Sequence, residues 1–163
     1  METSSEKGYY SILRKLPNAV AVIKGSPEYS SVSGTVKFYQ GRSGVLVVAE
    51  ADGLPYLDGN CTNNFFGFHI HGGEECSGNY GDEFANAGIH YDPDNCPHPY
   101  HAGDIPPLLA ADGRAFLAFL TDRFTVSEIL GKTVIIHSKP DDFTSQPAGN
   151  AGSKIACGII RKM

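Results

Sequence analysis

Apolar and polar residues alternate along several short stretches of this chain, and turn residues separate these stretches. In residues 31–40 the alternation is regular, which is typical of a β-strand with one buried face. Similar apolar runs occur at residues 18–25, 44–51, 66–73, 114–120, 132–137 and 154–161. The pattern therefore predicts about eight strands.

Helical patterns are scarce by comparison. Residues 124–132 (FTVSEILGK) have one, and a helix of this length needs tertiary contacts to be stable. The dipeptide Asp112-Gly113 predicts a hairpin turn. Many short strands without long helices favour an all-β fold, as an antiparallel sandwich or barrel. Two segments, 74–105 and 138–153, have no strand pattern, and loops of that length in a compact domain are usually functional or disordered.

Composition narrows the class of protein. The chain has 163 residues, of which 41% are hydrophobic and 19% charged, and this suits a single globular domain, 1–163. Its formal charge of -5 argues against a nucleic-acid partner, which normally requires a basic face. No apolar run approaches the roughly 20 residues that cross a bilayer, and residues 1–20 lack the core of a signal peptide. We therefore expect a cytoplasmic protein with no membrane partner, or an extracytoplasmic one if an export signal has been removed.

The cysteines are not arranged as a metal site. Cys61, Cys76, Cys96 and Cys157 form no CxxC pair, so disulfides are a better interpretation than a thiolate zinc ribbon. Disulfides seldom persist in reducing compartments, so this interpretation fits poorly with a cytoplasmic location.

The strand FGFHIHGG (66–73) raises a question of chemistry. His69 and His71 share one face, and Phe68 and Ile70 share the other. From this pair alone, metal binding and a solvated strand face are equally good interpretations. However, all six histidines of the chain come after residue 68, and imidazole is the usual protein ligand of zinc and copper.

The segment HYDPDNCPHPYHAGD strengthens the metal interpretation. Its His90, His98, His101 and Asp104 supply enough ligands for a closed tetrahedral zinc site, and its prolines would stiffen the loop that holds them. The alternative is a polar surface loop with incidental histidines.

Five short motifs of this chain resemble those of a known protein family. GFHIH, AGIHYDP, HAGD, VIIHSKPDD and GNAGSKIACGII occur in the order found in copper/zinc superoxide dismutases, and the chain resembles a short-loop, bacterial-like member from about residue 18 onward. Residues 1–17 would then be an extension. The resemblance implies an eight-stranded antiparallel Greek-key β-sandwich or barrel, with a long metal-binding loop and a short electrostatic-type loop.

The resemblance also implies two metal sites. It makes His69, His71, His90 and His137 copper ligands and His90, His98, His101 and Asp104 zinc ligands, with His90 bridging both. In the family's mechanism two superoxide anions and protons become dioxygen and hydrogen peroxide as copper alternates between Cu(II) and Cu(I). His90 is released and takes up a proton, while zinc orders the loop and tunes the bridge.

Further roles follow from the same resemblance. Asp141 matches a carboxylate that accepts hydrogen bonds from His69 and His98, although a solvated charge is an equal interpretation from the residues alone. Cys76 and Cys157 match the family's disulfide. Cys61 and Cys96 are then left as a second pair, or as two free, buried thiols.

The chain departs from the family pattern at the mouth of the copper channel. Lys154 stands where well-known members carry an arginine, and a lysine attracts an anion but orients it less well. Two loops are short as well, since only two residues separate His98 from His101 and the loop after His137 is trimmed. The resemblance leaves open whether the protein is a monomer or a homodimer.

Two other functions compete with the enzyme. A non-catalytic copper- and zinc-binding domain, such as a metal buffer or a chaperone-like relative, is the main alternative, and the complete ligand set together with Lys154 speaks against it. A structural zinc domain without copper would leave His69, His71 and His137 without a role.

Overall fold

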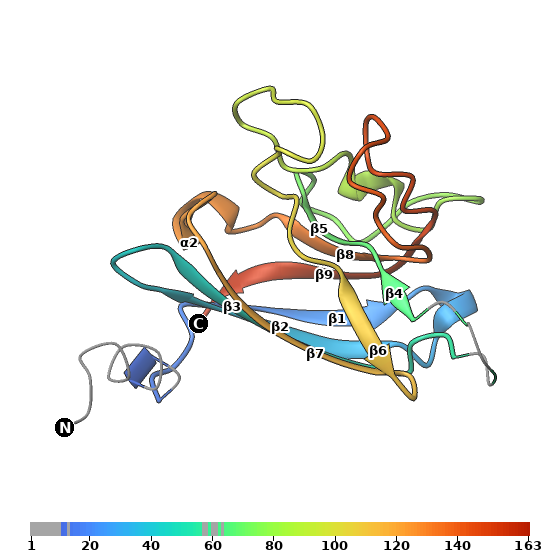
Figure 1. Ribbon diagram of the computed structural model, residues 1–163, viewed down its shortest axis with the longest axis horizontal. Helices are drawn as coiled ribbons and strands as arrows, with labels where there is room; N and C mark the ends of the chain where they lie inside the picture. Colours follow the sequence, from blue (N-terminus) through green and yellow to red (C-terminus); the bar gives the residue numbers. More distant parts are fainter. Residues whose placement is uncertain (1–10, 13, 57–58, 60–61, 63) are drawn as a thin grey trace.

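The structure is a computed structural model that describes residues 11–12, 14–56, 59, 62 and 64–163 (Figure 1). Its strands are β1 (Ala19–Gly25), β2 (Ser33–Gln40), β3 (Val45–Asp52), β4 (Phe65–Phe66), β5 (Phe68–His71), β6 (Leu108–Ala111), β7 (Arg114–Thr121), β8 (Thr133–His137) and β9 (Lys154–Lys162). Short helical elements are the 3-10 helices η1 (Pro27–Tyr29) and η2 (Ala85–Ala87) and the α-helix α2 (Val126–Ile129).

The strands form one antiparallel sheet that nearly closes into a barrel. Its strand order is β4-β6-β7-β3-β2-β1-β9-β8-β5. The two edge strands, β4 and β5, are consecutive in the chain and separated by Gly67 alone. This short connection brings the two edges of the sheet side by side and confirms the predicted all-β fold class.

Gly67 is the residue that permits this closure. Its N–H donates to the carbonyl of Lys139 and its own carbonyl accepts from the N–H of His137, both at 2.8 Å. A Cβ atom here would lie 2.8 Å from the Cβ of Ala151 and 3.2 Å from that of His137, so only glycine fits without movement of its neighbours.

The core lies inside the curved sheet and is built by the alternating residues of the strands. Strand β1 shows the pattern most clearly, because Ala19, Ala21 and Ile23 are buried whereas Val22 on the opposite face is exposed. Phe38, Phe66 and other residues from nearly every strand complete one continuous apolar cluster that runs from Ala19 to Ile160. This cluster is the main hydrophobic core of the described residues.

The predicted elements agree closely with those observed. The strand expected at 66–73 is split into β4 and β5 by Gly67, and β6 is a short strand that the pattern did not single out. The described residues therefore form nine strands rather than about eight. Asp112 and Gly113 form the predicted hairpin turn between β6 and β7, with φ of 52° and 73°. The expected helix at 124–132 is present as α2.

The two long loops emerge on the same side of the sheet. Loop 72–107 joins β5 to β6 and loop 138–153 joins β8 to β9, and Figure 1 shows both above the β5 and β8 edge. Because β5 and β8 pair directly, with His69 opposite Ile135, the loops that follow these strands start close together. None of the described helices has the length and apolar character needed to cross a membrane.

Candidate metal centre

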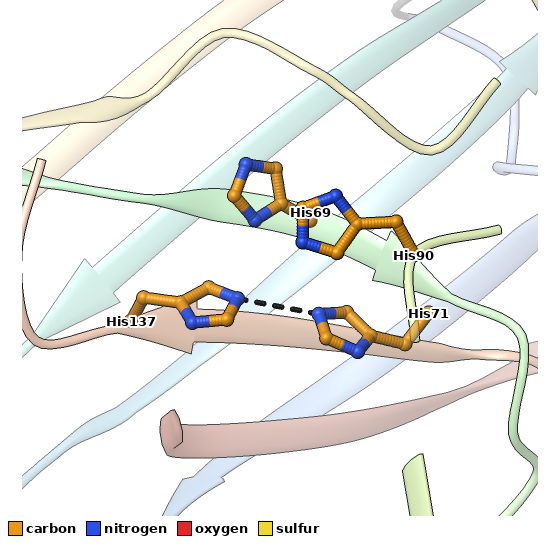
Figure 2. A group of neighbouring side chains, drawn as sticks. All are labelled: His69, His71, His90 and His137. Atoms are coloured by element: carbon orange, nitrogen blue, oxygen red, sulfur yellow. Dashed lines mark hydrogen bonds between the residues drawn. The ribbon is translucent and has the colours of Figure 1, made fainter. Parts of the chain in front are cut away.

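Four buried histidines from three parts of the chain meet above β5 and β8. His69 and His71 project from the same face of β5, His137 ends β8, and His90 comes from loop 72–107 (Figure 2). One ring nitrogen from each lies within 4.8 Å of those of the other three. We call these four residues the first histidine group. Phe68 and Ile70, which alternate with the strand histidines, are fully buried in the core.

The ring nitrogens of this group are arranged as ligands. Nδ1 of His71 donates to the carbonyl of Gly88 at 2.8 Å, and Nδ1 of His137 contacts the carbonyl of Gly152 at 3.4 Å. Burial, followed by the neighbouring imidazoles, lowers the pKa of both rings, and that of His137 falls to about 3. Both rings are therefore neutral, and their Nε2 lone pairs lie side by side at 3.2 Å, a typical geometry for two ligands of one cation.

A second group gathers around one carboxylate. Asp104 Oδ1 lies 2.6 Å from Nδ1 of His90, and its Oδ2 lies 3.1 Å from Nδ1 of both His98 and His101. Burial alone would raise the pKa of Asp104, but the hydrogen bond from His90 and the three nearby imidazoles lower it. We call His90, His98, His101 and Asp104 the second group, and His90 belongs to both.

Unpartnered nitrogens in these groups show that the site suits metal ions. His69 Nδ1, His90 Nε2 and His98 Nδ1 are buried and make no hydrogen bond, although His98 Nδ1 lies close to Asp104 without the required geometry. A buried nitrogen without a partner costs free energy, and a bound cation removes that cost. Four imidazoles suit copper, and three imidazoles with one carboxylate suit zinc, so the residues fit both ions.

Asp141 connects the two groups by contacting one histidine of each, on the ring nitrogen that faces away from the site. Its Oδ2 accepts from Nε2 of His69 at 2.7 Å, and its Oδ1 lies 3.0 Å from Nε2 of His98 and accepts from the N–H of Phe143. Burial would raise the pKa of this carboxyl, but the hydrogen bonds lower it to about 2. With 2% of its side chain exposed, Asp141 is not a solvated charge. It leaves His69 Nδ1 and His98 Nδ1 facing the site.

A pocket of about 650 Å³ gives access to the first histidine group. His71, His90 and His137 form part of its lining, and Lys154, at the start of β9, lines it as well. The Lys154 ammonium does not stand free, because Nζ lies 2.6 Å from Oδ2 of Asp82. No sequence motif singles out Asp82, because it is one of several acidic residues in loop 72–107.

Two further residues that the sequence analysis missed hold the loops. Nη1 of Arg123 lies within 3.1 Å of the carbonyl oxygens of Pro99, His101 and Asp104. Gln146 from loop 138–153 accepts from the N–H of His98 at 3.0 Å and donates to its carbonyl at 2.7 Å. Both side chains bind backbone atoms, so no sequence motif marks them.

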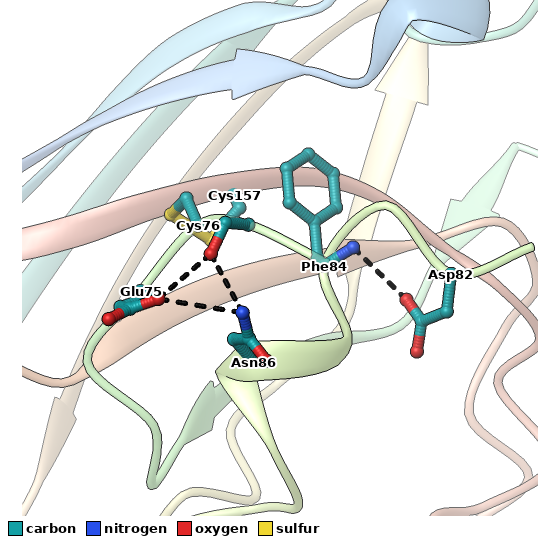
Figure 3. Close-up of a disulfide and its surroundings, with 7 residues drawn as sticks. Glu75, Cys76, Asp82, Phe84, Asn86 and Cys157 are labelled. Atoms are coloured by element: carbon teal, nitrogen blue, oxygen red, sulfur yellow. Dashed lines mark hydrogen bonds between the residues drawn. A yellow bond between two sulfur atoms is a disulfide. The ribbon is translucent and has the colours of Figure 1, made fainter. Parts of the chain in front are cut away.

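The cysteines are partly accounted for. Cys76 and Cys157 form a disulfide that ties loop 72–107 to β9 (Figure 3). Cys96 makes no disulfide with any described residue, and Cys61 lies outside the described residues. The pairing of Cys61 with Cys96 therefore stays a prediction.

Comparison with known proteins agrees with this geometry. Residues 32–160 match the family model of copper/zinc superoxide dismutase (SODC). The chain is 34% identical to superoxide dismutase [Cu-Zn] 2 of Aquifex aeolicus over 80% of each chain, and 35% identical to superoxide dismutase [Cu-Zn] of Legionella pneumophila over 78% of this chain and 77% of the relative. Superoxide dismutase [Cu-Zn] A of Xenopus laevis is 34% identical over 87% of this chain and 95% of its own. From the matched fold, the two ligand groups and these relatives together, the chain belongs to the copper/zinc superoxide dismutase family.

Proposed function

We propose that this protein is a superoxide dismutase that uses copper and zinc to convert superoxide and protons into dioxygen and hydrogen peroxide. The observation that carries the proposal is the pair of ligand groups that share His90 beneath an open pocket. A pocket over the first histidine group gives a small anion a path to that group, which a purely structural metal site does not need.

The buried nitrogens without a hydrogen-bond partner support a ligand role for these residues. Copper would be held by His69, His71, His90 and His137, and zinc by His90, His98, His101 and Asp104. When bound, copper supplies one-electron redox chemistry and zinc supplies a redox-inert positive charge.

The side chains of this protein supply the remaining steps. His90 faces one group with Nδ1 and the other with Nε2, so Nε2 is the atom at which a proton is held and passed to the product. Asp141 orients His69 and His98 by binding the nitrogens that do not face the site. Lys154 is the cationic group that meets superoxide in the pocket.

The decisive experiment measures the rate constant of superoxide loss by pulse radiolysis on protein loaded with copper and zinc, with metal content determined on the same sample. We expect rapid turnover with one copper and one zinc per chain. The variant H137Q, which removes one copper ligand, should lose turnover and copper while it retains zinc. Full metal content without turnover in the wild type would instead favour the non-catalytic copper- and zinc-binding alternative.

We also propose that residues 1–163 form one domain, with residues 1–17 as an extension. The continuous apolar cluster from Ala19 to Ile160 supports this division. The cytoplasmic location stays a prediction, which fractionation of cells that express the natural gene would test. Monomer and homodimer are distinguished by sedimentation equilibrium of the metal-loaded protein.

A further inference from the structure

The charges around the pocket are unusual for a protein that binds an anion. Among the described residues that line it, Lys154 carries the one permanent positive charge, whereas Glu28, Asp82 and Glu83 are acidic. The nearest of these acids, Asp82, contacts the lysine directly, with Nζ and Oδ2 2.6 Å apart. An anion in the pocket therefore meets an ion pair rather than an isolated ammonium group.

Asp82 is held in place independently of Lys154. Its Oδ1 accepts from the N–H of Phe84 at 3.1 Å (Figure 3), and its backbone exchanges hydrogen bonds with Asn79 at 3.0 and 3.2 Å. The disulfide between Cys76 and Cys157 fixes the start of the same loop to β9, the strand that begins with Lys154. Asp82 and Lys154 thus lie on two anchored segments of the chain, and their charged groups point toward each other.

Exposure shows that the contact lies at the pocket surface. The Lys154 side chain is 15% exposed and that of Asp82 is 40% exposed. Most of the Lys154 side chain is thus covered, and Asp82 fixes the position of its ammonium group. Because the two charges are opposite and only 2.6 Å apart, their fields largely cancel for an approaching anion that is still much farther away than this separation.

We propose that Asp82 is a positioning residue that holds Lys154 against loop 72–107 and cancels its charge, and that it thereby limits the rate at which superoxide enters the pocket. The proposal rests on the proposed dismutase function. It has a direct consequence for ionic strength, because salt screens attraction and repulsion alike. The wild-type rate constant should change little with salt, or rise as the acidic lining is screened.

The variant D82N tests the proposal at equal metal content. Asparagine keeps an oxygen for the N–H of Phe84 but loses the negative charge beside Lys154. At low ionic strength we expect the superoxide rate constant to rise about threefold, as for removal of one repulsive charge near the path of an anion, and then to fall with added salt. The matched control is E83Q, which removes an equal charge from the next residue of the pocket lining, for which the structure gives no contact with Lys154.

A double variant separates the lysine from the general field. In the K154Q background, adding D82N should raise the superoxide rate constant no more than adding E83Q to the same background does. An unchanged or lower rate constant in D82N, an equal gain in E83Q, or an undiminished gain in D82N/K154Q would each overturn the proposal.

A second readout uses the metal-loaded protein and does not depend on activity. Limited acetylation followed by mass spectrometry should modify Lys154 more slowly than the exposed Lys24 in the wild type, and several times faster in D82N than in the wild type. Equal modification of Lys154 in both proteins would overturn the contact itself. If instead metal-loaded wild type shows no dismutation while acetylation behaves as expected, the proposed function fails and the Asp82 contact stands.

Discussion

Asp141 links the first histidine group to the second group, because one carboxylate oxygen binds His69 and the other binds His98. His69 and His98 both offer their Nε2 to it, which leaves Nδ1 of each ring facing the site. A carboxylate accepts both hydrogen bonds, so it selects one tautomer and one ring orientation for each histidine at once. The tuning of both sites therefore depends on a residue that binds neither metal.

Replacing Asp141 with asparagine tests this arrangement. The amide has one acceptor oxygen instead of two, so either His69 or His98 loses its partner. We expect zinc and copper affinities to fall about 10- to 100-fold, measured by competition with a coloured chelator. The neighbouring variant D142N is the control, since Asp142 binds the loop residues Thr144 and Ser145. Unchanged affinities in D141N would contradict the role given to Asp141.

Lys154 allows a second prediction at this scale. Arginine has five N–H donors in a rigid fork, so in K154R some donors bind Asp82 while others face the pocket. We expect K154R to raise the superoxide rate constant a few-fold at equal metal content, because the guanidinium orients the anion as well as attracting it. K154Q, which removes the charge, should lower it. Equal or lower activity of the arginine variant would show that orientation at this position does not limit the rate.

At the scale of elements, the loops depend on contacts between side chains and backbone. Gln146 binds both backbone groups of His98 and so joins loop 138–153 to loop 72–107. Arg123, which follows β7, reaches three carbonyl groups of the segment that carries His101 and Asp104. These contacts give two long segments without strands a defined shape.

The variant R123Q tests how much this anchoring contributes. The two N–H groups on Nη1 are shared among three carbonyl oxygens near the surface, so together they should contribute about as much as one hydrogen bond from a charged donor, about 1.5–3 kcal/mol, and a shorter, neutral side chain loses most of this. We expect the free energy of unfolding to fall by about 2 kcal/mol in urea denaturation, and zinc affinity to fall with it. R114Q is the control, because the pair of Arg114 with Asp52 is largely exposed and should contribute under about 1 kcal/mol. Equal effects of the two variants would rule out a special role for Arg123.

At the scale of the whole molecule, closure of the sheet buries the histidines of the first group. The connection through Gly67 sets the edge strands β4 and β5 beside each other, β5 pairs with β8, and the loops cover the ends of these strands. Burial, first among the causes, lowers the pKa of His69, His71 and His137 below the ordinary value. The fold thus favours neutral imidazoles, whereas the unfolded chain would protonate them in mild acid.

This predicts a specific pH dependence for the metal-free protein. Unfolded histidines bind protons below about pH 6.5, whereas the folded rings resist protonation, for His137 down to about 3. The free energy of unfolding should therefore be flat above about pH 7. It should then fall as pH decreases from 6.5, by up to about 1.4 kcal/mol per pH unit for each buried histidine.

Urea unfolding of metal-free protein at several pH values between 7.5 and 5 measures this slope. H137Q has no ionisable group at this position. The free energy of unfolding should therefore fall less steeply with decreasing pH, by the contribution of one buried histidine, up to about 1.4 kcal/mol per pH unit. A flat profile for the wild type over this range would mean that the folded protein protonates these rings as readily as the unfolded chain does.

Periodicity and turn residues were sufficient to predict most of the architecture. The alternation in residues 31–40, the Asp112-Gly113 turn and the short helix near 126 depend on local preferences, and each is observed. Strand β6 was missed because its four residues, LLAA, have no alternation of their own and become a strand by pairing with β4 and β7.

By itself the sequence determined the kind of chemistry: six histidines and Asp104 in recognisable motifs, with His69 and His71 on one strand face because a strand alternates its side chains. Only the tertiary structure decided how these groups interact, because closure of the sheet brings together residues far apart in the chain. It set Lys154 against Asp82, Arg123 against the backbone carbonyls of His101 and Asp104, and Gln146 across the two loops. Such contacts depend on position in space and on backbone atoms, and neither leaves a pattern in the order of amino acids.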